Sequence, residues 1–338
     1  MGGSSPVPEL HCIAIQTPFA VGDVNVYVHT GGSMVTLFDA AVLTYEAWDA
    51  LCAGLGGIGL RVCDIGRVML THHHFDHVGL LRRVISESSA EICGHPDLLE
   101  EIQLSYGYND AHAEYFSGLM AEMGVPGEWI AAYLLRRDQH RHFIDIYTMD
   151  RALANGEELD GFRVVHVPGH SPTDTLFVRD QERWAVTGDH ILEKINPNPI
   201  LRRPKPGMRR AQSLVQYQES LRVTRAVDVD VCFPGHGGPI RDHRIVVDGI
   251  LAQHERRNSR IMECFPEGGR TPFEAASLLY PRMTSEDVFF CLSVGVGQLE
   301  LLESRGLLVS RQEDGLVRYY LPAHAPAVSE KRDIEYDE

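Results

Sequence analysis

Four histidines and one aspartate crowd into positions 72–77 of this 338-residue chain, directly after an apolar run that is typical of a buried strand. Residues two apart in an extended segment point the same way, so His72 and His74 can hold one cation from the same side. Asp76 and His77, a turn further on, can face a second cation beside it. The spacing therefore predicts half of a metal site. The alternative is a polar loop with one or two capping histidines.

Three later segments carry single candidate ligands, each after a strand-like run and a glycine. They read Val167-Pro168-Gly169-His170, Val186-Thr187-Gly188-Asp189 and Phe233-Pro234-Gly235-His236. With the first cluster, their content and order resemble the metallo-β-lactamase superfamily of metal-dependent hydrolases. The resemblance implies one metal on His72, His74 and His170, a second on Asp76, His77 and His236, Asp189 as the bridge, and Asp39 as a residue that supports the ligands through hydrogen bonds.

Two strand-rich halves carry these ligands at strand ends, and the resemblance implies an α+β fold, a four-layer αββα sandwich. We expect a catalytic domain at residues 1–244. A helical pattern at 97–145, rich in aromatic residues and methionine, interrupts it. These side chains either pack the helices onto the sheet or form a lid with an apolar wall for substrate, and we expect a lid insertion.

Residues 245–325 combine three helical patterns with a hairpin signal at Asp314-Gly315. This content predicts a winged-helix-like module, and with it the chain resembles the branch of the superfamily that includes β-lactamase-like protein 2. Between 285 and 322 there are three basic and six acidic residues, which would repel phosphate. We therefore expect a packing or homodimerisation element, followed by a disordered tail at 326–338.

The overall composition and charge disfavour some classes of binding partner. A net charge of −16 argues against nucleic acid and acidic membranes as general partners, and no run approaches the ~20 apolar residues needed to span a bilayer. Seven scattered cysteines indicate reduced thiols, and the first residues lack the features of a signal peptide. We expect a cytoplasmic protein.

A basic stretch follows the candidate bridging residue and gives the best candidates for substrate binding. Five positive charges fall within residues 202–210, where a solvated loop is the plain alternative. The residues expected to contact an anionic part of the substrate, such as a coenzyme A phosphate, a carboxylate or an RNA backbone, are Arg202, Arg203, Arg209 and Arg210. His190 is a further candidate because it follows Asp189.

The ligand set predicts hydrolysis. Two zinc ions, or iron or manganese in the second site, would hold a bridging hydroxide that attacks an electrophilic carbon or phosphorus. Asp76 is both a ligand and a candidate acceptor for the nucleophile's proton. We expect a small-molecule acyl substrate, an ester or thioester such as an acyl-CoA or a lactone. The alternatives are an endoribonuclease and a non-catalytic winged-helix binding protein.

Overall fold

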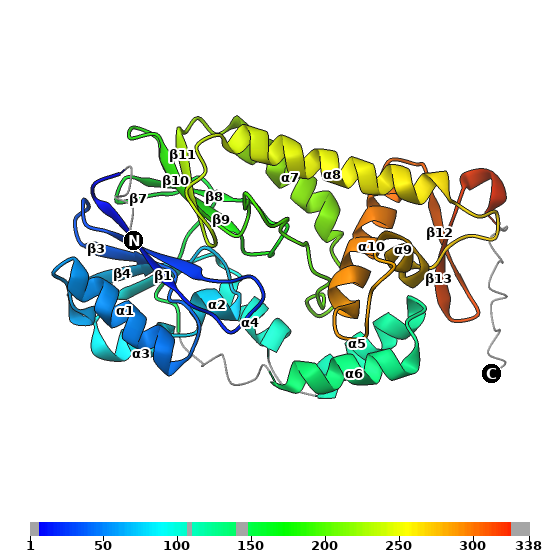
Figure 1. Ribbon diagram of the computed structural model, residues 1–338, viewed down its shortest axis with the longest axis horizontal. Helices are drawn as coiled ribbons and strands as arrows, with labels where there is room; N and C mark the ends of the chain where they lie inside the picture. Colours follow the sequence, from blue (N-terminus) through cyan, green and yellow to red (C-terminus); the bar gives the residue numbers. More distant parts are fainter. Residues whose placement is uncertain (1–6, 107–109, 140–147, 326–338) are drawn as a thin grey trace, which may run out of the picture.

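The computed structural model describes residues 7–106, 110–139 and 148–325. Within these ranges the chain forms two β-sheets, a separate hairpin and helices on both sides of the sheets and at one end (Figure 1). The expected tail at 326–338 lies outside the described residues, as do 107–109 and 140–145 of the expected insertion.

The first sheet begins as an antiparallel meander and continues with parallel strands. Its order is β1 (Leu10–Ile15), β2 (Val24–His29), β3 (Val35–Phe38), β4 (Ile65–Met69), β5 (Glu91–Gly94) and β6 (Arg151–Ala152). The crossover from β3 to the parallel β4 contains α1 (Tyr45–Gly57), which Thr44 caps, and the short η1 (Val62–Asp64). The crossover from β4 to β5 contains α2 (Phe75–Val78) and α3 (Leu81–Glu87).

The second sheet has the order β11 (Val231–Pro234), β10 (Trp184–Gly188), β9 (Thr175–Arg179), β8 (Phe162–His166) and β7 (Glu158–Leu159). Neighbouring strands from β7 to β10 are antiparallel, whereas β11 runs parallel to β10. The parallel connection passes through α7 (Ser213–Ala226), which covers the outer face of this sheet.

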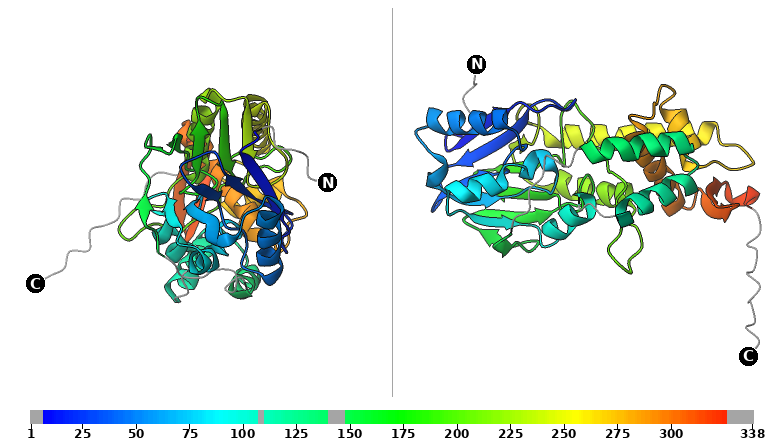
Figure 2. Two further views of the ribbon diagram at one scale, coloured as in Figure 1. Left: turned by 90° about the vertical axis from the view of Figure 1, so that its left-hand side faces the viewer. Right: turned by 90° about the horizontal axis from the view of Figure 1, so that it is seen from below.

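The four layers of the sandwich are held together by three apolar cores, one between the sheets and one between each sheet and its helices. Between the sheets, Phe38 of the first packs edge-on against Phe162 of the second at 5.2 Å. The outer face of the first sheet is covered by α1 and α3, and that of the second by α7 and α8 (His243–Glu263). The expected αββα arrangement is therefore confirmed, and Figure 2 shows the same layers from two further sides.

The insertion divides between two places. α4 (Leu98–Tyr106) packs on the sandwich through Leu98 and Ile102. α5 (Asp110–Glu122) and α6 (Gly127–Gln139) instead bury aromatic and methionine side chains, among them Phe116 and Met120, against α10 (Val288–Ser304). These two helices therefore pack with the C-terminal helices (Figure 1), and their role as a lid stays a prediction.

The C-terminal part contains the expected three helices and hairpin. α8 is followed by α9 (Pro272–Leu279), α10, β12 (Val309–Glu313), β13 (Leu316–Tyr320) and the short η3 (Pro322–His324). α10 packs against both α9 and α7, so the segment is joined to the sandwich through helix packing. Its winged-helix character stays a prediction. None of the described helices combines the length and the apolar run needed to cross a membrane.

Candidate metal centre

The expected ligands come from the carboxyl ends of four strands. β4 ends at Met69, a few residues before His72; β8 leads to His170, and β10 and β11 end beside Asp189 and His236. Because these ends lie at the same edge of the two sheets, residues far apart in sequence meet there. Three groups of potential ligand atoms result, each with its atoms within 4.8 Å of one another.

The first group consists of three imidazoles. His72 Nε2 lies 3.1 Å from His74 Nδ1, which in turn lies 3.0 Å from His170 Nε2. Burial, together with the neighbouring His170, lowers the pKa of His74 to about 3. A neutral imidazole presents a lone pair, so this group has the protonation state that a cation requires.

The second group adds a carboxylate and is linked to the first. It contains Asp76, His77 and His236, with His236 Nε2 3.5 Å from Asp76 Oδ2. The carboxylate of Asp189 lies between the two groups. Its Oδ1 is 3.4 Å from His77 Nε2, and its Oδ2 is 3.8 Å from His170 Nε2.

Buried atoms without partners show that these residues fit cations. His77 Nε2, His236 Nε2 and Asp189 Oδ1 are buried and have no hydrogen-bond partner among the described residues, an arrangement that is costly unless another group binds them. Although burial opposes protonation, the carboxylates of Asp189 and Asp76 raise the pKa of His236 to about 9. The carboxylates therefore stabilise positive charge at this position, and divalent cations would supply that charge.

Hydrogen bonds behind the ligands fix which ring nitrogen faces inward. Asp39 accepts from Thr71 Oγ1 at 2.7 Å and lies 2.9 Å from His77 Nδ1. Since the hydrogen of Thr71 goes to Asp39, the Thr71 oxygen accepts from His72 Nδ1 at 3.0 Å. His236 Nδ1 donates to the Asp23 carbonyl at 2.7 Å. In the neutral form of each of these three histidines, which a bound cation would favour, Nε2 carries the lone pair and faces the centre.

Two glycines leave room for the ligands. Gly188 has a φ of +50°, and a Cβ there would lie 2.6 Å from Thr71 Oγ1. A Cβ on Gly235 would overlap Asp189 and lie 2.6 Å from His77 Cε1. Glycine is thus required before Asp189 and before His236, because the side chains of neighbouring residues approach the backbone closely at both positions.

His73 turns away from the groups as a structural residue. Its Nδ1 lies 2.9 Å from Ser171 Oγ, and its Nε2 lies 3.2 Å from Ser105 Oγ of α4. The sequence reasoning did not single out Thr71 or Ser171, although each stands directly beside an expected ligand. Their small hydroxyl side chains next to the motifs were the available signal.

The residues expected to bind substrate are not members of the three ligand groups. His190 is outside all three ligand groups: its Nε2 lies 2.8 Å from Thr224 Oγ1 of α7, and burial lowers its pKa to about 3. Arg202 donates to Ser213 and to Gln216, the latter at 2.6 Å.

The other three arginines differ in their partners. Arg210 is paired with the buried Glu300 of α10. Within the described ranges Arg203 and Arg209 have no ion pair. Arg203 and Arg209 therefore stay available to a ligand, whereas Arg202 and Arg210 hold the loop in place.

The comparisons with known proteins agree with this fold. The family model described as the metallo-β-lactamase superfamily matches residues 20–236, so the chain belongs to this superfamily, as expected. It is similar to the probable metallo-hydrolase YqjP of Bacillus subtilis, with 32% identity over 92% of this chain and 97% of that protein. The β-lactamase-like protein 2 homolog of Drosophila melanogaster is 24% identical over 89% of each chain.

A more distant relative and a solved structure add to these similarities. The atrochrysone carboxyl ACP thioesterase of Aspergillus fumigatus is 24% identical over 72% of this chain, but the match spans 45% of that protein. The crystal structure of a metallo-β-lactamase family protein from Thermus thermophilus superposes with a TM-score of 0.79. It is 27% identical and covers 94% of this chain and 100% of its own.

Proposed function

We propose that this chain is a binuclear metal-dependent hydrolase of carboxylic thioesters and related esters. The observation that carries the proposal is the linkage of the three ligand groups through shared residues, His72 and His77, with Asp189 between them. Ligands linked in this way support two neighbouring cations. Two bound cations would lower the pKa of water and polarise a carbonyl oxygen.

The residues of the chain have separate tasks in such a reaction. The histidines and Asp189 hold the cations, while Asp39 and Thr71 keep the imidazoles in the required tautomer. Asp76, whose side chain is 12% exposed, is our candidate for receiving the proton of the attacking water at a carboxylate oxygen. Hydrolysis joins the water oxygen to the carbonyl carbon and breaks the carbon–sulfur bond, which leaves a carboxylic acid and a thiol.

The thioester class is supported by the similarity to an ACP thioesterase. The endoribonuclease alternative is disfavoured by the net charge of −16, because phosphodiester backbones are bound through basic surfaces. A non-catalytic role gives no reason for so many buried, convergent ligands. For the metals we propose two zinc ions, with iron or manganese as the alternative in the carboxylate-containing group.

Elemental analysis of the purified protein, paired with a panel of acyl-CoA, lactone, β-lactam and RNA substrates, tests the proposal. We expect about two metal ions per chain and thioester turnover. His170→Ala should lower both, whereas His95→Ala, which alters a histidine outside the ligand groups, should retain both. Full metal content in His170→Ala, or turnover of RNA alone, would contradict the proposal.

A further inference from the structure

The three candidate ligands of the first group lie on two segments of the chain. His72 and His74 belong to the segment after β4, and His170 belongs to the turn after β8. His170 Nε2 lies 3.0 Å from His74 Nδ1, so the three imidazoles converge only while the two segments keep this spacing. The contacts that hold the segments together therefore bear directly on binding of the first cation.

His73 makes such contacts from the side of its segment that faces away from the centre. In an extended segment, a residue between two that face the centre points in the opposite direction. The backbone N–H of His73 donates to Thr173 Oγ1 at 3.1 Å. Its ring Nδ1 lies 2.9 Å from Ser171 Oγ and 3.2 Å from Thr173 Oγ1. His73 thus joins the segment of the first two ligands to the turn that follows His170.

The turn presents its two hydroxyl groups in a fixed arrangement. Asp174 Oδ2 accepts from Ser171 N at 2.8 Å, and Thr173 N donates to Ser171 Oγ at 3.1 Å. The two hydroxyl oxygens lie 2.9 Å apart. Ser171 and Thr173 are fully buried and Asp174 is 2% exposed, so bulk water does not compete for these hydrogen bonds. The turn is therefore a rigid partner for His73.

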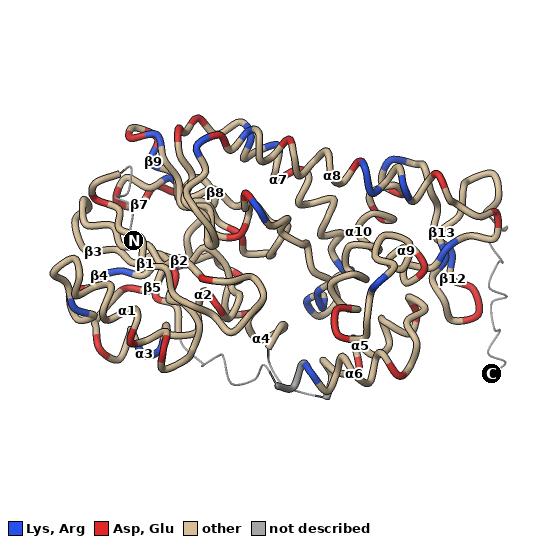
Figure 3. The backbone as a smooth tube through the Cα atoms, in the orientation of Figure 1, with Lys and Arg blue, Asp and Glu red and all other residues tan. Residues whose placement is uncertain are grey.

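The other side of the His73 ring is held by α4. Its Nε2 lies 3.2 Å from Ser105 Oγ, and its ring centre lies 6.1 Å from that of Tyr106. α4 is itself packed on the sandwich through Leu98 and Ile102. The side-chain partners of His73 are hydroxyl groups and not the charged residues that Figure 3 marks, so its hold on the two segments depends on geometry.

We propose that His73 is a positioning residue for the first metal ion: it holds the two ligand-bearing segments at the spacing that the first three ligands need. Within the part of the chain that the structure describes, it has no hydrogen bond to a member of the second group, Asp76, His77 and His236. Loss of its contacts should therefore weaken one metal site and spare the other. The inference rests on the binuclear centre of the proposed function.

Two variants of His73 separate its contacts. The amide of asparagine reaches about as far as Nδ1, toward Ser171, and that of glutamine about as far as Nε2, toward Ser105. His73→Gln, which loses the contact with the turn, should lower the affinity for one zinc ion about 10- to 100-fold in competition with a chelator. His73→Asn retains this contact and should stay closer to the wild type. Unchanged affinity in His73→Gln, or equal losses in both variants, would overturn the proposal.

Removing one ligand group at a time shows which ion is affected. His236→Ala leaves the first group intact, and adding His73→Gln to it should weaken binding of the remaining zinc ion. His170→Ala leaves the second group intact, and adding His73→Gln should not change the affinity of that group. Equal weakening in both backgrounds would indicate a general loss of structure and contradict a positioning role.

Cobalt(II), whose visible absorption depends on the geometry of its ligands, gives a second readout. In the His236→Ala background, His73→Gln should change the cobalt spectrum and His73→Asn should largely restore it. Ser171→Ala removes the same contact from the side of the turn and should reproduce the effect of His73→Gln, so the test holds even if His73→Gln does not fold. A wild-type spectrum and zinc affinity in Ser171→Ala would count against the proposal.

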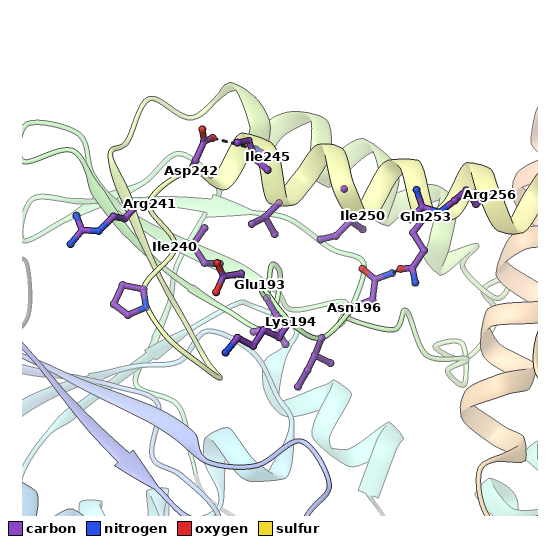
Figure 4. Close-up of a pocket in the computed structure, with 15 residues that line it drawn as sticks. Glu193, Lys194, Asn196, Ile240, Arg241, Asp242, Ile245, Ile250, Gln253 and Arg256 are labelled. Atoms are coloured by element: carbon purple, nitrogen blue, oxygen red, sulfur yellow. Dashed lines mark hydrogen bonds between the residues drawn. The ribbon is translucent and has the colours of Figure 1, made fainter. Parts of the chain in front are cut away.

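Gln253→Leu is a matched control. The side chain of Gln253 on α8 is hydrogen-bonded to that of Asn196, in the segment after Asp189, at a groove of about 700 Å³ (Figure 4). The variant therefore breaks another hydrogen bond between two segments, one of which follows a candidate ligand, but neither His73 nor its partners line this groove. Both zinc ions should bind as in the wild type. Selective loss of the first ion in this control would contradict a specific role for His73.

Metal binding and turnover together distinguish failure of this inference from failure of the proposed function. Thioester turnover by a wild type with two zinc ions, combined with unchanged zinc affinity in His73→Gln, would leave the proposed function intact and overturn the role of His73. Selective loss of the first ion in His73→Gln, combined with no thioester turnover by the wild type, would support the role of His73 and count against thioester hydrolysis.

Discussion

At the scale of single residues, the orientation of the candidate ligands depends on the direction of the hydrogen bonds that their side chains make. Thr71 donates to Asp39 and therefore must accept from His72, so one hydroxyl group passes the orienting effect of a carboxylate to a second histidine. His77 is oriented by the same carboxylate directly. Asp39 thus controls one candidate ligand in each of the two metal groups.

Asp39→Asn tests this control. Asparagine tolerates the φ of +62° found at this position, so the backbone should be retained. One oxygen cannot replace both carboxylate oxygens, and the new NH₂ group would face a donor. We expect metal affinity, measured by competition with a chelator, to fall about 10- to 100-fold.

A matched control is Asp248→Asn, which changes an exposed carboxylate on α8 that pairs with Arg225. It should bind metal as the wild type does. A folded Asp39→Asn protein with undiminished metal affinity would show that Asp39 does not position the ligands.

The candidate ligands could be identified from the sequence, whereas most of the groups that hydrogen-bond to them could not. Paired His-x-His and Gly-His or Gly-Asp spacings identify the groups that meet at the strand ends. The carbonyl of Asp23, which accepts from His236, could not be predicted because a backbone acceptor has no residue type. Likewise, the partner of Arg210 is Glu300, ninety residues later, so charge density alone could not separate a structural arginine from a free one.

At the scale of elements, residues 196–210 act as a strap between helices. Lys205 pairs with Asp97 and with Glu100 of α4 at 2.8 and 2.7 Å. Arg210 pairs with Glu300 of α10. One loop therefore fixes the sandwich side of the insertion to the C-terminal helices, and most of its charge serves structure.

The variants Arg210→Gln and Arg209→Gln form a matched pair that tests whether the Arg210–Glu300 ion pair holds this strap. Glu300 is 4% exposed, and burial raises its pKa even beside Arg210. Removing Arg210 would leave this carboxyl without its cation, so we expect the free energy of unfolding in urea to fall by about 2–3 kcal/mol.

Arg209 is exposed, so Arg209→Gln should change the free energy of unfolding by less than about 0.5 kcal/mol. Equal stability of the two variants would show that the Arg210–Glu300 pair does not hold the strap.

Most helices could be predicted from the sequence, whereas their packing partners could not. The three helical patterns expected within residues 245–325 are present as α8, α9 and α10, and Thr271 caps α9 with Glu274, a local signal that the sequence contains. The helical pattern at 97–145 likewise contains α5 and α6. Their contact with α10 depends on a segment more than 150 residues later, and an apolar helix face does not specify which surface covers it.

At the scale of the whole molecule, the C-terminal helices are part of the same packed body as the sandwich. α7 lies on the second sheet and also contacts α8 and α10. His254 of α8 is fully buried at this junction, with its ring 6.0 Å from that of Tyr217 in α7. Within the part of the chain that the structure describes, neither ring nitrogen of His254 has a hydrogen-bond partner, so this histidine contributes bulk but no polar contact there.

Burial of His254 should make global stability depend on pH. Burial, aided by Arg257, lowers its pKa to about 4, against about 6.5 in the unfolded chain. As the pH falls below 6.5, the unfolded state binds a proton that the folded state excludes, so stability is lost until the pH reaches the folded value. Between pH 7.5 and 5 this one group should cost about 2 kcal/mol.

His254→Leu isolates that contribution, because leucine fills the site without a titratable ring. In urea unfolding we expect this variant to lose about 2 kcal/mol less than the wild type between pH 7.5 and 5. At pH 7.5 it should be at least as stable, since no hydrogen bond is removed. His324→Leu, at an exposed position, should follow the wild-type profile. Parallel pH profiles for wild type and His254→Leu would mean that the junction of α7 and α8 admits water or a proton.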